Sequence, residues 1–343
     1  MTGKEKNKKV IVAMSGGIDS SVAAALLKRA GFDVAGVFMR LFSGEKSKMP
    51  EARAKKVAKI LKIPFYVLNF EKEFGRRVVN YFLNENKKGL TPNPCIVCNK
   101  EIKFGLLLEK SLELKADYIA TGHYARIVKG KLYTGKDKER DQSYFLWKLG
   151  QNQLKRVLFP IGNCTKKEVE KLAGKLKLSF LVKIPKSQEI CFIENKLEAF
   201  LKKRLGIKSG NIVDSEGKTL GRHRGLWFYT IGQRKGIGFS GGPYYVLGKD
   251  LKKNLLIVDK NERNLYKEEL VLKRSNWVSG KRPKLPLIVK VKIRYRHSAA
   301  PAVLGKRANL TILKFKKKQR AITPGQSAVF YKGSEVLGGG IIY

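Results

Sequence analysis

The chain is poor in acidic residues: its 343 residues include 28 Asp and Glu against 72 Lys and Arg, so its formal net charge is +44. A small neutral metabolite requires no such excess. Each phosphate that a protein neutralises releases condensed counterions, so a polyanion such as a nucleic acid is the natural partner of this charge. An anionic membrane surface would also attract it, but the apolar runs are far shorter than the roughly 18 residues of a spanning helix. We therefore expect a nucleic-acid partner and no membrane insertion.

Cysteine and histidine are also scarce, with four and three residues. Four cysteines in a chain of this length do not make a disulfide scaffold. The first apolar run, residues 10–14, is too short for the hydrophobic region of a secretory signal. We expect a cytoplasmic protein in a reducing compartment, where cysteines are free thiols, metal ligands or catalysts.

Strand-like and helix-like segments alternate through the first half of the chain, whose full length predicts two or three domains. Such alternation indicates βαβ units around a parallel sheet. The predicted strands are 10–14, 33–41, 65–70 and 117–120, and the predicted helices are 21–29, 51–61, 71–86, 100–114 and 165–177. The last helix opens with a capping box, Thr165 and Glu168.

Beyond residue 207 short β-like runs are separated by turn signals, and several of them alternate with period two. This pattern predicts a small antiparallel barrel at the C-terminus. We expect an α/β domain with a parallel sheet over residues 1–206, a central linking domain over 207–258 and the barrel over 259–343.

Ser15-Gly-Gly-Ile-Asp-Ser20 follows the first strand and opens the first helix. Glycines let the backbone approach a phosphate, and the helix N-terminus points free N–H groups at it. No Gly-Lys-Ser/Thr follows, so this is not a Walker A loop. It is similar to the SGGxDS loop of PP-loop ATP pyrophosphatases, which adenylate a substrate and release pyrophosphate. That resemblance implies ATP and Mg²⁺, with Asp19 serving the metal or the loop geometry and Met39 lying near the adenine.

The most informative cysteine lies in residues 91–104, where prolines stiffen a loop that runs into a helix. We expect Cys98 at or just before the helix N-terminus, with Lys100 and Lys103 close by. A helix end favours a thiolate by about 0.3–1 kcal/mol, which is less than one pKa unit of about 1.36 kcal/mol. The lysines must therefore supply the rest of any activation. Cys191 is the second candidate.

Cys95 and Cys98 could also be half of a zinc site, but a structural zinc needs four ligands. Cys164 and Cys191 are too far apart in the sequence to form a second Cys-x-x-Cys pair. A thioredoxin-like redox pair is disfavoured, because such motifs follow a strand in a different fold. No motif of polar residues surrounds Cys164 in the sequence, and we expect its side chain to be buried and to pack as a small apolar group.

Taken together, these motifs closely resemble the MnmA family of bacterial tRNA-specific 2-thiouridylases over nearly the whole chain. The segments that carry the resemblance are 14–20, 91–104, 121–125, 141–146, 187–192, 229–236 and 323–327. The family uses ATP to replace the oxygen on carbon 2 of the wobble uridine in tRNAs for Lys, Glu and Gln by sulfur. It has a PP-loop domain, a small central domain and a C-terminal β-barrel. The resemblance implies this fold, the anticodon stem-loop as substrate and a persulfide sulfur-carrier protein as partner.

Position by position, the resemblance makes Cys98 the nucleophile and Cys191 the carrier of the persulfide, and the two can form a disulfide that a reductant must reopen. The implied ATP-binding positions are Ala13, Met14, Ser15, Gly16, Gly17, Ile18, Asp19, Ser20, Met39 and Gly122. The implied contacts with the target base or the tRNA are Asn93, Pro94, Cys95, His123, Arg140, Asp141, Gln142, Arg294, Tyr295 and Gln326.

The chain departs from the family at Cys95, where many members have an Asp that is assigned as general base. Two interpretations stay open. Cys95, Cys98 and Cys191 could hold three corners of a [4Fe-4S] cluster with one open iron, as in related thiolases, or Cys95 only replaces the Asp. Two alternatives to the function also stay open: another PP-loop enzyme, such as a 4-thiouridine or an amide-forming synthetase, and a non-enzymatic RNA-binding protein.

Overall fold

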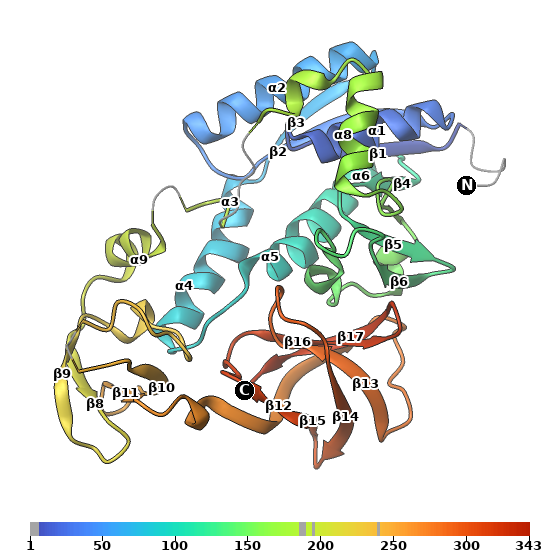
Figure 1. Cartoon of the computed structure of the whole chain (residues 1–343). Helices are drawn as coiled ribbons and strands as arrows, with labels where there is room; N and C mark the ends of the chain where they lie inside the picture. Colours follow the sequence, from blue (N-terminus) through green and yellow to red (C-terminus); the bar gives the residue numbers. More distant parts are fainter. Residues whose placement is uncertain (1–6, 185–189, 194–195, 239–240) are drawn as a thin grey trace.

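The computed structural model describes residues 7–184, 190–193, 196–238 and 241–343. A parallel sheet with helices on both faces lies at the top of Figure 1, a small sheet at the lower left and a barrel at the lower right. Among the described residues, no helix is both long and apolar enough to cross a membrane.

The parallel sheet has the strand order β3-β2-β1-β4-β7. These strands are β1 (Lys9–Ala13), β2 (Asp33–Arg40), β3 (Phe65–Asn69), β4 (Tyr118–Ala120) and β7 (Val157–Leu158). Alternate residues of a strand face opposite sides, so Val10 and Val12 enter one hydrophobic core while Ile11 and Ala13 enter another. Burial on both faces explains why the sequence shows a continuous apolar run there. The predicted α/β fold class is confirmed.

Helices cover both faces of this sheet. One face carries α1 (Ile18–Arg29), α2 (Glu45–Leu61) and α8 (Lys166–Lys175). The capping box of α8 is formed as predicted, because Thr165 accepts a bond from the Glu168 backbone and Glu168 returns one. The other face carries α3 (Glu71–Phe74), η2 (Gly75–Val79), α5 (Pro94–Val97), η3 (Cys98–Leu106) and α6 (Leu107–Glu113). The remaining helical segments of this part are α4 (Asn80–Lys87), η4 (Ser143–Leu146), α7 (Gln151–Leu154), η5 (Ser179–Leu181) and α9 (Leu197–Leu205).

The helix that follows the Pro-rich loop begins earlier than the sequence predicts. It starts at Pro94 rather than Lys100, because proline is favoured in the first helical turn and the Asn93 side chain caps it by accepting a bond from Cys95 N (3.1 Å). Cys98 therefore lies one turn inside the helix and not at its N-terminus, which corrects the expectation. From Cys98 onward the helix has π geometry, with hydrogen bonds from i to i+5.

A β-hairpin that the sequence analysis did not predict joins the first part of the chain to the barrel. Its strands are β5 (Ala125–Val128) and β6 (Lys131–Thr134), and β6 pairs with β17. Lys129 and Gly130 between them both have positive φ, which is typical of the two-residue turn that matches strand twist. In a sequence, Lys-Gly indicates a hairpin turn less strongly than Asn-Gly. The two strands are also too short to show a clear alternation of apolar and polar residues.

The C-terminal barrel is confirmed. Its strands run in the order β12-β15-β14-β13-β16-β17, and β12 also pairs with β17, so the sheet closes on itself. The strands are β12 (Tyr266–Trp277), β13 (Leu287–Lys292), β14 (Ala300–Arg307), β15 (Leu310–Arg320), β16 (Ser327–Lys332) and β17 (Glu335–Ile342).

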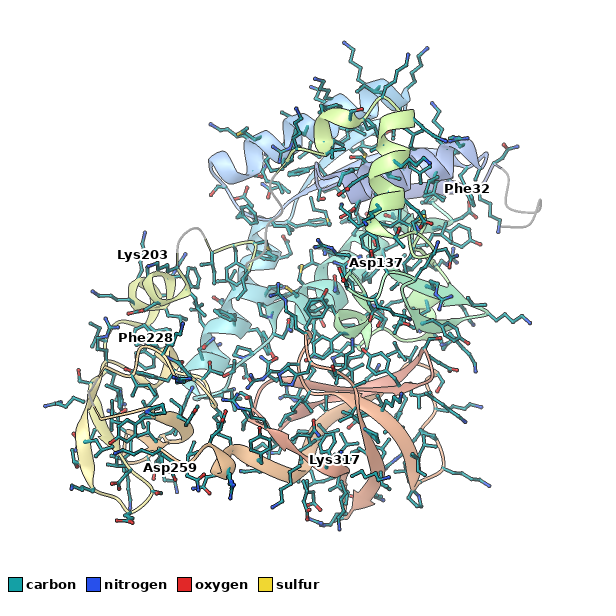
Figure 2. The ribbon with its side chains drawn as sticks, viewed as in Figure 1. Phe32, Asp137, Lys203, Phe228, Asp259 and Lys317 are labelled. Carbon is teal, nitrogen blue, oxygen red and sulfur yellow. The ribbon has the colours of Figure 1, made fainter. Side chains whose placement is uncertain are left out.

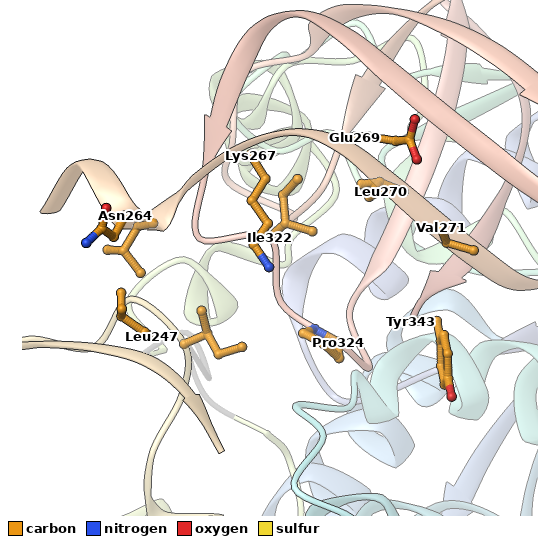
Figure 3. Close-up of a pocket in the computed structure, with 11 residues that line it drawn as sticks. Leu247, Asn264, Lys267, Glu269, Leu270, Val271, Ile322, Pro324 and Tyr343 are labelled. Atoms are coloured by element: carbon orange, nitrogen blue, oxygen red, sulfur yellow. The ribbon is translucent and has the colours of Figure 1, made fainter. Parts of the chain in front are cut away.

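The stretch of chain that connects the two larger parts forms a sheet of order β10-β11-β8-β9 with its own apolar core. Its strands are β8 (Gly210–Val213), β9 (Thr219–His223), β10 (Tyr245–Asp250) and β11 (Leu255–Asp259), with short 3₁₀ turns η6 (Leu226–Phe228) and η7 (Glu262–Leu265). Figure 3 shows a cavity of about 200 Å³ where this sheet meets the barrel, lined among others by Leu247, Ile322 and Tyr343. None of the predicted site residues, all of which the structure describes, lines this cavity.

Candidate active site

The predicted ATP-binding positions converge at one edge of the parallel sheet. β1 lies between β2 and β4, and all three strands end at this edge. The loop from Ser15 to Ser20 follows β1, Met39 lies near the end of β2, and Gly122 follows β4. Ligands of open α/β sheets bind beyond the carboxyl ends of the strands. The structure therefore brings together a set that the sequence scatters over more than a hundred positions.

The serines of the loop shape its backbone. Ser20 Oγ accepts a bond from Ser15 N (3.1 Å) and donates to Gly17 O (3.1 Å), and Ser21 Oγ donates to the same carbonyl (2.8 Å). Ser20 and Ser21 are buried. In this conformation the hydroxyl protons of Ser20 and Ser21 bond to Gly17 O, so neither hydroxyl is free to donate to a phosphate.

Two positions of the set require glycine because other backbone atoms lie too close for a side chain. Gly16 has φ +73°, and a Cβ there would lie 2.2 Å from the Pro50 carbonyl oxygen in α2. A Cβ on Gly122 would lie 2.6 Å from Ser20 N, at the start of α1. No side chain fits at either position without moving backbone.

Asp19, in the first turn of α1, has two partners from distant parts of the chain. Its Oδ1 accepts a bond from the Tyr124 hydroxyl (2.8 Å) and an ion-pair contact from Lys166 Nζ (2.5 Å). Burial raises the pKa of Tyr124, and the neighbouring carboxylate raises it further. Sequence analysis missed both partners. The only signal for Lys166 was its place just after the Thr165 cap.

The three candidate cysteines differ in accessibility, and all four cysteines are free thiols. Cys98 is buried in η3, whereas Cys95 and Cys191 reach the surface. The segment of Cys191 is fixed by Phe192, whose ring packs against Phe74, Phe82 and Phe200 with centroids 5.6–5.7 Å apart. Residues 187–189 of the same motif lie outside the described part of the chain.

Burial and neighbouring charges shift the pKa values of the three thiols. Burial raises the pKa of Cys98 to about 12 and that of Cys191 to about 11, and it also raises the pKa of Cys95. Negative charge on Cys95 would raise the other two further, while the Lys103 ammonium lowers all three. Cys95 and Cys191 are reached by water, yet the protein around them still disfavours a thiolate. In this conformation the desolvation of Cys98 outweighs the effect of the Lys103 cation on its pKa.

The π geometry of η3 decides which lysine faces the thiols. In an α-helix, residues five apart are separated by about 140° around the axis, but the i→i+5 bonding of a π-helix brings them to neighbouring positions. Lys103 is five residues after Cys98 and thus shares its face. Lys100 instead donates to Gln153 Oε1 (2.8 Å). Only one of the two lysines expected near Cys98 acts on it.

Replacing Lys103 by Met is expected to slow alkylation of Cys191 and Cys95 by iodoacetamide about tenfold at pH 8. Removing the cation raises the thiol pKa, so the thiolate fraction falls and the pH midpoint of the reaction moves up. Peptide mass spectrometry against pH measures this at each cysteine. Lys100→Met is the matched control and should react like the wild type. Equal shifts in both variants would contradict the placement of Lys103.

The cysteines do not present a ligand set for an iron–sulfur cluster in this conformation. Among the described residues, no three His, Cys, Asp or Glu side chains are grouped so that they could hold a metal ion. One of the three thiols is buried while the other two face outward.

Two predicted tRNA contacts are buried and hold the site from within. His123 lies between the rings of Phe104 and Phe159, with Nδ1 2.7 Å from Thr121 Oγ1, and burial lowers its pKa well below the usual value. Asp141 is buried and accepts bonds from Gly135 N (3.0 Å) and Ser143 N and Oγ (3.1 and 2.9 Å). In this conformation His123 is neutral and both side chains position the loops beside η3.

Other predicted tRNA contacts join the domains. Gln326 Nε2 donates to Thr91 O (2.8 Å), and Thr91 N donates to Pro324 O (2.9 Å). These two hydrogen bonds fix a barrel loop to the segment that leads into α5 and its cysteines. Arg294 Nη2 donates to Ala321 O (2.9 Å) in the barrel and to Ile231 O (3.2 Å) in the linking part.

The remaining members of this set lie as follows. Tyr295 packs on Phe145 with centroids 4.4 Å apart, Gln142 Oε1 accepts from Tyr124 N (3.0 Å), Arg140 is exposed, and Asn93 and Pro94 open α5. Arg140, like Cys95 of the same predicted set, is exposed and open to a partner.

A parallel sheet with a glycine loop of this type at its carboxyl edge defines a nucleotide-binding domain of the PP-loop class. Family models match in three segments: the "tRNA methyl transferase HUP domain" over residues 8–195, the "tRNA methyl transferase PRC-barrel domain" over 198–260 and the "Aminomethyltransferase beta-barrel domain" over 267–342.

Curated relatives narrow this class to one family. The tRNA-specific 2-thiouridylase MnmA 2 of Thermoanaerobacter sp. is 46% identical, with 98% of both chains covered. The MnmA of Carboxydothermus hydrogenoformans is 44% identical, with 98% of this chain and 97% of the relative covered. This chain belongs to the MnmA family of tRNA-specific 2-thiouridylases. A likeness to the solved U34-tRNA thiolase NcsA of Methanococcus maripaludis with its [4Fe-4S] cluster is weak (TM-score 0.38, 20% identity, 60% of this chain and 66% of that chain) and carries no argument for a cluster here.

Proposed function

We propose that this chain is an ATP-dependent tRNA 2-thiouridylase that acts on the wobble uridine in tRNAs for Lys, Glu and Gln. The observation that supports this most directly is that Cys98 and Phe192, the residue next to Cys191, pack in one hydrophobic cluster of a domain that also has the glycine loop. A phosphate-activating site alone would suit an amide-forming synthetase, which needs no paired cysteines. An RNA-binding protein without enzymatic activity would need neither the phosphate-activating site nor the paired cysteines.

The reaction that we propose begins with an activated leaving group. The uridine O2 attacks the α-phosphorus of ATP, pyrophosphate leaves, and carbon 2 then carries AMP. The terminal sulfur of a persulfide on Cys191 attacks carbon 2, and the C2–O bond breaks with release of AMP. Cys98 Sγ then attacks Cys191 Sγ, and the electron pair of the broken S–S bond goes to the sulfur on carbon 2. The products are 2-thiouridine and a Cys98–Cys191 disulfide, which an external thiol reduces.

A second order of steps gives the same products. Cys98 first attacks Cys191 Sγ and expels hydrosulfide, which then attacks carbon 2. In both orders a thiolate at Cys98 is required, and its high pKa means that the thiol must lose its proton during the reaction. Lys103 is the cation that favours this loss.

The structure suits the further partners that we propose. Cys191 reaches the surface, where a persulfide sulfur-carrier protein can load it. Asp19 has no hydrogen bond to its Oδ2 from any described residue, so that oxygen is available to Mg²⁺, which usually binds through one or two carboxylates and substrate phosphates. Four free thiols suit a reducing compartment, and we propose the cytoplasm.

Mass spectrometry of nucleosides tests the function. Unmodified tRNA is incubated with the protein, ATP, Mg²⁺ and a sulfide source, then digested. We expect 2-thiouridine at the wobble position. The appearance of 4-thiouridine instead, or ATP-dependent pyrophosphate release without any thionucleoside, would refute the proposal.

Binding of tRNA is expected to weaken steeply with salt, because the net charge of +44 serves phosphate contacts. Exposed lysines occur on every part of the molecule; Lys203 on α9 and Lys317 on β15 are labelled in Figure 2. Each phosphate contact contributes a slope of about −0.7 to −0.9 in log K against log salt, so several contacts give a slope of several units. Filter binding between low and physiological salt measures the slope. An affinity that does not change with salt would contradict the role of the charge.

A further inference from the structure

Lys166 is a lysine whose ammonium is held at the phosphate loop by a residue far away in the sequence. It is the first residue of α8, which packs beside α1, and its side chain is only 11% exposed. Its Nζ lies 2.5 Å from Oδ1 of Asp19, whose side chain is 38% exposed. The backbone of Lys166 is fixed as well, since its N–H donates to Asp137 Oδ2 (2.8 Å); Asp137 is labelled in Figure 2.

This ion pair places opposite charges at a site that must receive a polyphosphate. The N-terminus of α1 already offers backbone N–H groups to an anion, and a bare carboxylate in its first turn would repel that anion. Lys166 cancels this repulsion before the nucleotide arrives. When a metal ion takes the carboxylate, the ammonium loses its partner at the place where phosphate oxygens lie. A nearly buried ammonium that has lost its partner is strongly stabilised by an anion within hydrogen-bond distance.

We infer that Lys166 is a catalytic residue that exchanges Asp19 for the β- and γ-phosphate oxygens of ATP and holds the departing pyrophosphate. The inference rests on the proposed function, because it needs a reaction that releases pyrophosphate. When the bond between the α-phosphorus and the oxygen that bridges it to the β-phosphorus breaks, this oxygen takes the electron pair. The Lys166 ammonium stabilises the negative charge that develops on the leaving pyrophosphate.

Binding of inorganic pyrophosphate to the full chain, measured by calorimetry with tRNA and ATP absent, tests this without any turnover. Lys166→Met is expected to weaken pyrophosphate binding about tenfold to a hundredfold, the loss of one charged hydrogen bond. Lys166→Arg should recover most of it. Lys167→Met removes the same charge from the next residue, which is exposed on the same helix, and should bind like the wild type.

The other side of the pair gives an effect of opposite sign. With EDTA present, Asp19→Asn frees the ammonium and is expected to tighten pyrophosphate binding about tenfold. A pair that only braces α8 against α1 would make both variants weaker or leave both unchanged, and either result would overturn the inference. Because the two variants change different elements, misfolding of Lys166→Met would still leave Asp19→Asn to decide.

Failure of the inference can be told apart from failure of the proposed function. If the wild type releases pyrophosphate and thiolates tRNA while Lys166→Met binds pyrophosphate normally, only the role of Lys166 is wrong. If the wild type forms no thiouridine, the function is wrong, and pyrophosphate binding still reports on the ion pair.

Discussion

Cys98→Ser is expected to abolish thiolation of tRNA while pyrophosphate release from ATP continues. Serine replaces the sulfur that must attack Cys191 but leaves the loop from Ser15 to Ser20 unchanged, since Cys98 lies on the opposite face of the sheet from α1. Loss of an attacking group costs at least about 10³-fold in rate. Thionucleoside yield and pyrophosphate release, measured on the same samples, separate the two steps.

Cys191→Ser should lose thiolation to a similar extent, and it should also fail to retain radiolabelled sulfur from a persulfide donor. Cys98→Ser should retain that label. Cys164→Ser is the matched control, because Cys164 is half-buried against the core around α1 and α8 and makes no part of the site. Full thiolation by Cys98→Ser, or labelled sulfur retained by Cys191→Ser, would contradict the assigned roles.

Gly16→Ala is expected to reduce tRNA-dependent pyrophosphate release by at least about 10²-fold, which is the usual result of misplacing a reacting group by about 1 Å. The new Cβ would meet the Pro50 carbonyl at 2.2 Å, and φ of +73° is unfavourable for alanine. The loop must therefore shift relative to α2. Initial rates of pyrophosphate release at saturating ATP measure the loss.

Two further measurements make this result specific. Gly75→Ala lies in a helical backbone, and no atom beyond its chain neighbours and its own helix backbone is within 4 Å of the new Cβ, so it should keep wild-type activity. The tRNA affinity of Gly16→Ala at fixed salt should stay near that of the wild type, because other surfaces bind the tRNA. An active Gly16→Ala enzyme would show that the loop does not hold the phosphates.

Features of the site that depend on neighbouring residues were predictable. The order strand, glycines, helix is contiguous from Val10 to Ser20, so the amino-acid sequence alone places the phosphate loop at the end of the first strand. The capping box at Thr165 and the period-two strands of the barrel are local in the same sense. The β5–β6 hairpin was missed because the Lys129–Gly130 turn is a weak indicator of a hairpin. The start of α5 was placed too late because Asn93 was not considered as the helix cap.

The state of the thiols could not be predicted in this way. Helix ends and nearby lysines each lower the pKa of a thiol, but burial of Cys98 raises its pKa to about 12. Desolvation depends on atoms from several elements packed around one side chain, and no stretch of sequence records that sum. The choice between Lys100 and Lys103 likewise needed the π geometry of η3.

The sequence by itself determined which residues this protein has available: a glycine loop after the first strand, two candidate cysteines on separate segments and a large positive charge. Tertiary structure alone decided which groups meet. Asp19 and Lys166 pair across 147 residues, and Gln326 grips Thr91 across 235. Such contacts form because the folded core fixes where each element lies, and pairwise distance in space does not follow from separation along the chain.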